Sequence, residues 1–336
     1  MYQYDKVVFI GRFQPFHNGH AKVLEAALRL GEEVYILLGS SFKARSIKNP
    51  FTEKDRSLMI HKSVSEKDGR RIRLDWTRDY LYNEDLWMKG IQEAVDAKPG
   101  EKVGIIGYSK DRSSYYLKKF PQWDLIDVDL VKPLDATTIR NVYFQSPHSE
   151  LLKSVLPEPV QDYLEDFSKT EFYADLVEEF KFVQAYKESW SKAPYQPTFN
   201  TVDGVITCAG HVLMVKRRMA PGKGQWALPG GFVNPGETLL ESTIREIKEE
   251  TSIQLNPAVL LGNIKQSKVF DHPDRSLRGR TITYASHIPL TFNELPLVKG
   301  GDDAEKARWI SYSELVEIED QVFEDHLEII NNFTGI

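Results

Sequence analysis

Ten residues near the start of the chain, GRFQPFHNGH at positions 11–20, combine side chains that bind phosphate. Arg12, His17 and His20 are hydrogen-bond donors, and Gly19 lets a phosphate approach the backbone closely. The stretch directly follows a short apolar run that is typical of a buried strand. A loop from a parallel strand into a helix presents free backbone N–H groups and the positive end of the helix dipole. The sequence therefore predicts a site for the triphosphate of a nucleotide.

Two common nucleotide-binding motifs are absent from the sequence. No G-x-G-x-x-G follows the first strand, and no G-x-x-x-x-G-K-[ST] occurs anywhere in the chain. Nicotinamide-linked hydride transfer and P-loop hydrolysis are therefore excluded. The structural alternative, in which both histidines only cap the helix or pack at its entrance, is outweighed by the complete ten-residue string.

A second set of residues with chemical potential lies at positions 231–253, GFVNPGETLLESTIREIKEETSI. At 100° per residue, Glu246, Glu249 and Glu250 share one face of a helix. The nearly opposite face carries Leu240, Ile244, Ile247 and Thr251. Three adjacent carboxylates repel one another unless a hard divalent cation lies among them, so Mg²⁺ or Mn²⁺ is predicted. A solvated acidic face is the alternative, and the flanking glycines with Glu237 favour the metal site.

The length of the chain, 336 residues, exceeds what one hydrophobic core usually supports. We expect one domain at 1–190, a linker at 191–197 that contains two prolines, and a second domain at 198–336. In the first half, short β-branched runs alternate with helical patterns, which indicates a parallel α/β sheet. The expected strands are Lys6–Ile10, Glu33–Gly39, Arg71–Trp76, Lys102–Gly107 and Leu125–Val131.

The second half has an α+β pattern, with many short strands around one strong helix at 238–250. The expected strands are Val202–Thr207, Val212–Lys216, Thr281–Pro289 and Ala307–Ile310. The two halves do not resemble each other, and no repeat of fixed period occurs.

Composition limits the class of protein. The net charge of −6 gives no global basic field, so small molecules rather than nucleic acids are the expected partners. One cysteine, Cys208, excludes an intrachain disulfide, and the first residues lack a secretory signal, which predicts a cytoplasmic location. No apolar run approaches the roughly 20 residues that a membrane span needs. The oligomeric state stays open, with a homo-oligomer as one alternative.

The H-x-G-H string after the first strand resembles the motif of the nucleotidyltransferase superfamily, and GRFQPFHNGH resembles the archaeal-type nicotinamide mononucleotide (NMN) adenylyltransferases. The resemblance implies a Rossmann-like domain that joins ATP to NMN, giving NAD and pyrophosphate with help from Mg²⁺. It implies that Arg12, His17 and His20 hold the ATP phosphates. The other motif residues that it implies in substrate binding are Gly11, Phe13 and Gly19.

That family also has an S-x-T-x-x-R motif, which matches residues 135–140. Thr137 and Arg140 fit, so the resemblance implies a second phosphate-binding arginine with a threonine beside it. Asp135 stands where the motif has serine, and no role is carried over to it. A local ion pair on the first helical turn is the alternative for Arg140.

Further stretches resemble the family less distinctively. The resemblance implies that Trp87 stacks on the cationic nicotinamide ring, a contact worth about 0.5–2 kcal/mol, and that Asn83 lies nearby. Lys110, in GYSKDR, and Asp79 are further substrate-site candidates. Core packing for Trp87 and solvation for the polar residues stay open. A class I aminoacyl-tRNA synthetase is set aside because the first half lacks a separate tRNA-binding region.

Residues 231–253 match the Nudix box, with Ser252 in place of its second glycine. The resemblance implies a mixed sheet between helices and metal-assisted hydrolysis of a nucleoside diphosphate derivative. It implies that Glu246, Glu249 and Glu250 bind the metal, that the last two also act in catalysis, and that Glu237 supports them. Arg245 is expected to contact the substrate.

The general base is left open among Asp302, Asp303 and Glu305, and Trp226 or Phe270 could stack on the base or pack in the core. The favoured substrate is ADP-ribose, because it shares an adenosine diphosphate body with NAD.

Together the halves resemble bifunctional NMN adenylyltransferase and Nudix hydrolases, with Mg²⁺ or Mn²⁺ at both sites and ATP as a substrate. Two alternatives remain. In one, the second domain senses ADP-ribose or NAD without hydrolysing it. In the other, the acceptor is nicotinate or flavin mononucleotide.

Overall fold

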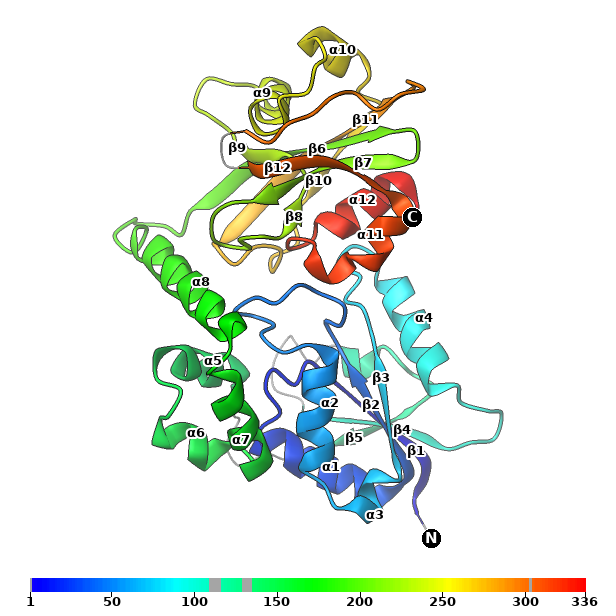
Figure 1. Ribbon diagram of the computed structural model, residues 1–336. Helices are drawn as coiled ribbons and strands as arrows, with labels where there is room; N and C mark the ends of the chain where they lie inside the picture. The colour runs from blue at the N-terminus through cyan, green and yellow to red at the C-terminus, as the bar shows by residue number, and fades with distance from the viewer. Residues whose placement is uncertain (1, 109–115, 129–134, 302–303) are drawn as a thin grey trace. The chain divides into compact units, whose positions relative to one another are not determined.

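The computed structural model describes residues 2–108, 116–128, 135–301 and 304–336. It divides into two compact units, Met1–Val177 and Glu178–Ile336, each with its own sheet (Figure 1). The boundary lies within helix α8 (Glu171–Glu188). The linker at 191–197 therefore stays a prediction. Within the described residues, no helix has both the length and the apolar character that a membrane span requires.

The first unit is built on a five-stranded parallel sheet in the order β3-β2-β1-β4-β5. The strands are β1 Tyr4–Gly11, β2 Gly31–Leu38, β3 Ile72–Trp76, β4 Val103–Gly107 and β5 Asp124–Asp127. The predicted parallel α/β sheet is thus confirmed. From β1 the chain moves to β2 on one side, and the later strand β4 pairs with the other side of β1. Such a reversal opens a crevice at the carboxyl ends of the strands, where the phosphate-binding motif begins.

Helices surround this sheet. They are α1 Asn18–Leu30, α2 Glu53–Lys62, α3 Glu66–Gly69, α4 Glu84–Val95, α5 Ala136–Gln145, α6 Glu150–Val155 and α7 Glu158–Phe167, followed by α8. Strands that are buried on both faces read as continuous apolar runs. Val8, Leu37 and Ile105 accordingly lie in one core cluster with Ile91 of α4, and each of the four is 0% exposed.

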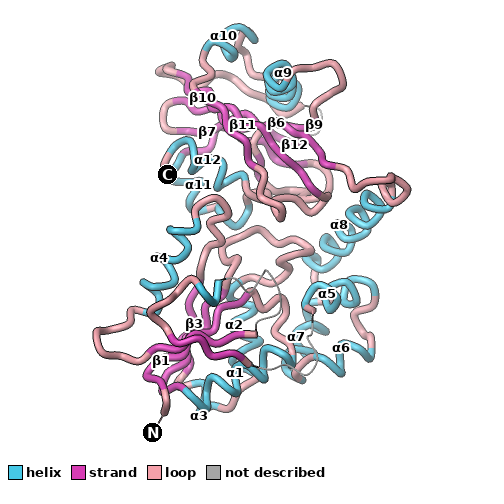
Figure 2. The backbone as a smooth tube through the Cα atoms, turned by 180° about the vertical axis from the view of Figure 1, so that it is seen from behind, coloured by secondary structure: helices cyan, strands magenta, loops and turns pink. Residues whose placement is uncertain are grey.

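The second unit contains a seven-stranded mixed sheet, seen as magenta tube in Figure 2. Its main path is β10-β11-β6-β7-β12, with β8 paired to β7 and β9 paired to β6. The strands are β6 Thr198–Cys208, β7 His211–Arg217, β8 Trp226–Ala227, β9 Gly230–Phe232, β10 Gln266–Phe270, β11 Arg280–Leu290 and β12 Ala304–Ser311. Only β6 and β11 run parallel among these described pairs.

The helices of the second unit are α9 Leu239–Thr251, α10 Pro257–Gly262, α11 Tyr312–Glu317 and α12 His326–Thr334, with a short 3₁₀ turn η2 at Glu319–Gln321. Helix α9 packs closely on β6: a Cβ on Gly204 would lie 2.7 Å from Ile247. Ile244, Ile247 and Thr251 are buried as the helical pattern predicts. The prediction for Leu240 is wrong, because this side chain on the first turn is 39% exposed.

Candidate functional sites

The loop after β1 ends in a reciprocal cap on α1. His17 is the N-cap residue, and its Nδ1 accepts the backbone N–H of His20 at 3.3 Å. The Nδ1 of His20 in turn accepts the backbone N–H of His17 at 3.3 Å. The two rings stack with 3.6 Å between their centroids.

This geometry fixes the protonation of both rings. Each Nδ1 is an acceptor, so each ring carries its proton on Nε2. Burial of the His20 ring, followed by the neighbouring His17, holds the pKa of His20 well below its usual value. The Nε2–H group of each ring can therefore donate to an anion.

Phe13 supports the histidines from within the core. Its side chain is 1% exposed, and its ring lies edge-on to His20 with 4.9 Å between centroids. Its backbone is left-handed (φ 50°), an uncommon state for a bulky residue that needs the surrounding packing to maintain it. A Cβ on Gly11 would lie 2.8 Å from the Phe13 ring. The Phe13 ring therefore belongs to the core, and the expected role of Phe13 in substrate binding stays a prediction. Gly19, also predicted to bind substrate, is buried in α1.

Arg140 of α5 anchors the same loop from another side. Its guanidinium donates to the carbonyls of Gln14 at 2.8 Å and Ile47 at 3.1 Å, and to Thr137 Oγ1 at 3.2 Å. Burial, followed by the neighbouring charge of Arg12, lowers the pKa of Arg140 to about 10. Arg140 is thus charged at neutral pH and lies near Arg12. The local carboxylate ion pair is not its main contact.

Asp135 explains how this helix begins without the serine of the motif. It is the N-cap of α5, and its carboxylate accepts the N–H groups of Thr137 at 3.1 Å and Thr138 at 3.2 Å. Aspartate and serine are equally good N-caps. The departure from the motif therefore preserves the local structure.

Arg56 is a site-supporting residue that the sequence analysis missed. It is 0% exposed and donates to the carbonyls of Arg12 at 2.7 Å and Gly39 at 2.6 Å, as well as to Ser41 at 3.1 Å. Burial lowers its pKa to about 10. The available signal was the T-x-x-D capping box at Thr52, which places Arg56 on the first turns of α2.

The remaining substrate-site candidates of the first unit are Asn83, Trp87 and Lys110. Asn83 is exposed and caps α4, accepting the N–H of Leu86 at 3.1 Å. Trp87 is half-buried against the core, 6.2 Å from the ring of Tyr116. Lys110 lies outside the described residues.

Asp79, which follows β3, is also accounted for. Its carboxylate accepts from the backbone N–H of Ser40 at 3.0 Å and pairs with Lys43 at 3.3 Å. Burial opposes its ionisation, but Lys43 and Ser40 lower its pKa below the usual value. It holds the end of β2 rather than standing free for a substrate.

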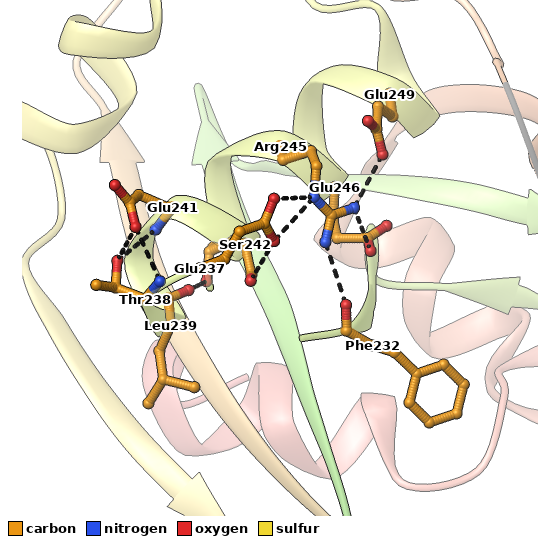
Figure 3. A network of polar contacts seen from close by, with 10 residues as sticks. Phe232, Glu237, Thr238, Leu239, Glu241, Ser242, Arg245, Glu246 and Glu249 are labelled. Atoms are coloured by element: carbon orange, nitrogen blue, oxygen red, sulfur yellow. Dashed lines mark hydrogen bonds and ion pairs between the residues drawn. The ribbon is translucent and has the colours of Figure 1, made fainter. Parts of the chain in front are cut away.

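In the second unit, Arg245 lies at the centre of the predicted acidic site (Figure 3). Its guanidinium contacts Glu237 at 2.8 Å, Glu246 at 2.7 Å and Glu249 at 3.0 Å. It also donates to the carbonyl of Phe232 at 3.1 Å. Arg245 and then Ser242 lower the pKa of Glu237 to about 2. Arg245 therefore organises the carboxylates, and its expected contact with the substrate stays a prediction.

Glu250 faces the end of strand β9. Its Oε2 accepts the backbone N–H of Gly230 at 2.9 Å. Burial is the main cause that raises its pKa to about 8, with smaller contributions from Glu246 and Asp203 and against the opposing effects of Gly230 and Arg217. The neighbouring Gly231 leaves room for Glu246, because a Cβ there would lie 2.6 Å from its Oε1.

The donor set fits a hard divalent cation. Three glutamates supply oxygen ligands, and a buried carboxylate with a raised pKa gains most from a nearby positive charge. Within the described residues no three acidic, histidine or cysteine side chains already form a metal cage. The Arg245 guanidinium balances the charges of Glu237, Glu246 and Glu249.

Only one of the three candidates for the general base lies within the described residues. The N–H of Gly301, which precedes the candidates in the chain, donates to the Glu250 carbonyl at 3.1 Å. Asp302 and Asp303 lie outside the described residues, and Glu305 is exposed on β12.

Core packing, one of the two alternatives for Trp226 and Phe270, is confirmed. Trp226 is 7% exposed and Phe270 is 2% exposed, so neither offers a free ring face.

A buried polar network behind the site was also missed. His326 Nδ1 accepts the N–H of Leu228 at 2.8 Å and so holds the segment that leads into β9. Beside it, Arg275 and Asp325 form a bidentate pair at 3.0 and 2.9 Å. These residues come from segments separated by 50 or more positions, and no local sequence pattern signals their pairing.

The comparisons with known proteins match each half of the chain to a known kind of domain. The model of the NUDIX domain matches residues 197–333, and the Cytidylyltransferase-like model matches residues 8–99. A crystal structure of a bifunctional NMN adenylyltransferase/ADP ribose pyrophosphatase from Francisella tularensis, complexed with AMP and a Mn ion, is 39% identical with a TM-score of 0.94. The match covers 99% of each chain. The chain belongs to this bifunctional family.

Single-function relatives match each part of this family member separately. A nicotinamide/nicotinic acid mononucleotide adenylyltransferase from Acinetobacter baylyi is 38% identical over 54% of the chain and 96% of its own length. An ADP-ribose pyrophosphatase from Methanocaldococcus jannaschii is 39% identical over 39% of the chain and 70% of its own length. The predicted architecture, a Rossmann-like nucleotidyltransferase unit followed by a Nudix unit, is confirmed.

Proposed function

We propose that this chain catalyses two reactions of NAD metabolism. The first transfers the adenylyl group of ATP to NMN, giving NAD and pyrophosphate. The second hydrolyses ADP-ribose to AMP and ribose 5-phosphate. The observation that carries the proposal is that one chain contains both a cationic loop at a sheet crevice and a carboxylate cluster on α9, in a family named for these activities.

In adenylyl transfer, a phosphate oxygen of NMN attacks the α-phosphorus of ATP, and the bond to pyrophosphate breaks. The protein aligns two anions and neutralises charge as it develops on the triphosphate. The Nε2–H groups of His17 and His20 donate to the phosphates, while Arg12 and Arg140 supply positive charge. No covalent enzyme intermediate is needed. Trp87 is proposed to stack on the nicotinamide ring of NMN.

In ADP-ribose hydrolysis, Glu246, Glu249 and Glu250 would hold a divalent cation, with Glu237 and Arg245 fixing their orientation. When bound, such a cation supplies an activated water and neutralises pyrophosphate charge. The buried Glu250 must ionise to take part, and the N–H of Gly230 orients its carboxylate for this role.

Product analysis tests the proposal directly. The protein is incubated with ATP, Mg²⁺ and NMN, and separately with ADP-ribose and Mg²⁺. We expect NAD and pyrophosphate in the first reaction, and AMP and ribose 5-phosphate in the second. Nicotinate and flavin mononucleotides, supplied in competition with NMN, identify the preferred acceptor.

A matched variant separates hydrolysis from sensing. Glu250→Gln should lower ADP-ribose turnover by about 10²-fold or more and leave NAD formation unchanged. Equal, negligible turnover of ADP-ribose by the wild type and Glu250→Gln would instead support a second unit that binds the nucleotide without hydrolysing it.

A further inference from the structure

The backbone group that holds Glu250 belongs to a short segment in which three consecutive residues are anchored. The N–H of Gly230 donates to Glu250 Oε2 at 2.9 Å. One residue earlier, the carbonyl of Pro229 accepts a backbone N–H of β6 at 2.8 Å. The N–H of Leu228 donates to His326 Nδ1 at 2.8 Å. The direction of the Gly230 N–H therefore depends on how the two preceding residues are held.

His326 is an anchor that lies 98 positions from Leu228 in the chain. It is the first residue of α12 and is 6% exposed. Because Nδ1 accepts from Leu228, the ring proton is on Nε2. That Nε2 faces Asp203 Oδ1 at 3.9 Å. Burial lowers the pKa of His326, against the raising effect of Asp203, so the ring is neutral at neutral pH and Nδ1 stays an acceptor.

Asp203 is fixed on the other side of the histidine ring. Its side chain is buried, and its Oδ2 accepts from Thr283 Oγ1 at 2.5 Å. Asp203 is also the partner of Gly230 in the pairing of β6 with β9. A Cβ on Gly230 would lie only 2.6 Å from Asp203 Oδ1. The carboxylate therefore contacts the segment before Glu250 and faces the ring that anchors it.

The start of α12 is itself tied down, so the His326 ring has a fixed position. The preceding residue, Asp325, forms a bidentate pair with Arg275 at 3.0 and 2.9 Å, and both side chains are buried. The N–H of Phe323 donates to the carbonyl of Trp226 at 2.8 Å. Buried charge pairs with complete hydrogen bonding resist displacement, because separating them leaves uncompensated charges.

We infer that His326 is a positioning residue for the metal site of the second unit, an inference that rests on the proposed hydrolase function. By holding Leu228, it keeps the N–H of Gly230 directed at the Glu250 carboxylate. His326 is not a metal ligand here, since Nδ1 is occupied and Nε2 faces Asp203. Groups that orient a metal-binding carboxylate from outside the coordination shell typically change metal affinity or activity about 10–100-fold when they are lost.

Two substitutions of similar size test which atom of His326 matters. Asparagine places its Oδ1 where Nδ1 lies and can accept from Leu228, whereas glutamine places its amide near the position of Nε2. His326→Asn should therefore restore Mn²⁺ affinity to within about twofold of the wild type, and His326→Gln should weaken it about tenfold. Both variants lose the buried ring, so thermal unfolding should show a similar loss of stability in each.

Mn²⁺ binding is measured without nucleotide, from the electron paramagnetic resonance signal of the free ion. The site at α9 is the one that Glu250→Gln removes. ADP-ribose hydrolysis gives a second measurement. The Mg²⁺ concentration for half-maximal turnover should rise about tenfold in His326→Gln, with a smaller change in kcat at saturating Mg²⁺.

His287→Gln is the matched control. His287 is also 6% exposed and lies on β11, but its Nε2 contacts Thr207 at 3.1 Å and not the segment before β9. Its replacement should leave Mn²⁺ affinity unchanged. An equal loss of Mn²⁺ affinity in His287→Gln and His326→Gln would assign the effect to general packing and overturn the inference.

The remaining results separate this inference from the proposed activity. If ADP-ribose is hydrolysed but His326→Asn and His326→Gln bind Mn²⁺ equally well or equally poorly, the positioning role is wrong and the hydrolase function stands. If ADP-ribose is not hydrolysed but only His326→Gln binds Mn²⁺ more weakly, the positioning role stands without that activity. Mn²⁺ binding that does not depend on Glu250 in the wild type overturns the inference.

Discussion

His17 and His20 cap one helix turn for each other, because the Nδ1 atom of each ring accepts the backbone N–H of the other at 3.3 Å. This exchange satisfies two donors that the start of α1 would otherwise leave open. Because each Nδ1 atom is used in the cap, the Nε2–H group of each ring can donate to another partner. The two residues therefore have a structural role and a phosphate-binding role that can be separated by mutation.

His17→Asn should separate the two roles. Asparagine is a strong N-cap, so the thermal stability of the first unit should be nearly retained. The lost Nε2–H should lower kcat for NAD formation by about 10²–10³-fold. His17→Ala should lose the same activity and about 1 kcal/mol of stability as well. Steady-state NAD formation and thermal unfolding measure these effects. Full activity of His17→Asn would show that the imidazole only caps the helix.

Asp135→Ser restores the residue that the family motif carries at the start of α5. Serine caps as well as aspartate, so NAD formation should stay within about twofold of wild type. Asp135→Ala should remove the cap of α5, lower stability by about 1 kcal/mol, and raise KM for ATP by loosening the turn that carries Arg140. A large loss of activity in Asp135→Ser would mean that the carboxylate itself contacts the substrate.

The raised pKa of Glu250 predicts that the free energy of unfolding depends on pH when no metal is bound. This pKa is raised from 4.5 to about 8 in the folded protein. The folded state therefore binds more protons than the unfolded state between these pH values, so stability falls as pH rises through this window. The slope is at most about 1.4 kcal/mol per pH unit. Urea unfolding in EDTA from pH 5 to pH 8 measures it.

Glu250→Gln is the control for that measurement, since it cannot ionise. Its stability in EDTA should lose this part of the pH dependence and exceed that of the wild type at pH 8. Mg²⁺ should stabilise the wild type more at pH 8 than at pH 6, because the cation competes with the proton for the carboxylate. An identical pH slope for the two proteins would assign the decline to other groups.

Ser252 ends helix α9 in the left-handed conformation, with φ 46°. The Nudix box has glycine here, and the structure keeps the turn that this glycine normally makes. Serine is strained in this conformation, so Ser252→Gly should raise stability by about 0.5–1 kcal/mol. Chemical denaturation measures the change in stability. ADP-ribose turnover is the second measurement. A loss of stability would mean that the Ser252 side chain makes a contact worth more than the backbone strain.

The fold was predictable wherever one pattern dominated a segment. The β-branched runs of β1 and β2 and the helical pattern of α9 appear at their expected places, within a few residues of the expected bounds. The short strands β8 and β9 were not predicted, since two or three residues are too few to show a period. The division between the two compact units falls within α8, whose helical pattern continues across Val177 and Glu178, so no sequence pattern marks it.

The residues of the two sites were easier to predict than the residues that hold those sites in place. The phosphate-binding loop and the glutamate cluster are local strings, so their spacing is visible in the sequence. Arg56 and His326 contact backbone groups that are distant in the chain, and only the folded structure brings them together. Trp226 and Phe270 were left open between stacking and core packing because aromatic content alone does not distinguish a core ring from an exposed one.

The buried Arg56 has a consequence for how quickly the first reaction can begin. Its guanidinium ties the segment after β1 to the end of β2, so the loop keeps its shape when no nucleotide is present. A site formed in advance loses little chain entropy on binding. A rise in cellular ATP would then be met at a rate set by diffusion and charge attraction, without waiting for a slow rearrangement of the loop.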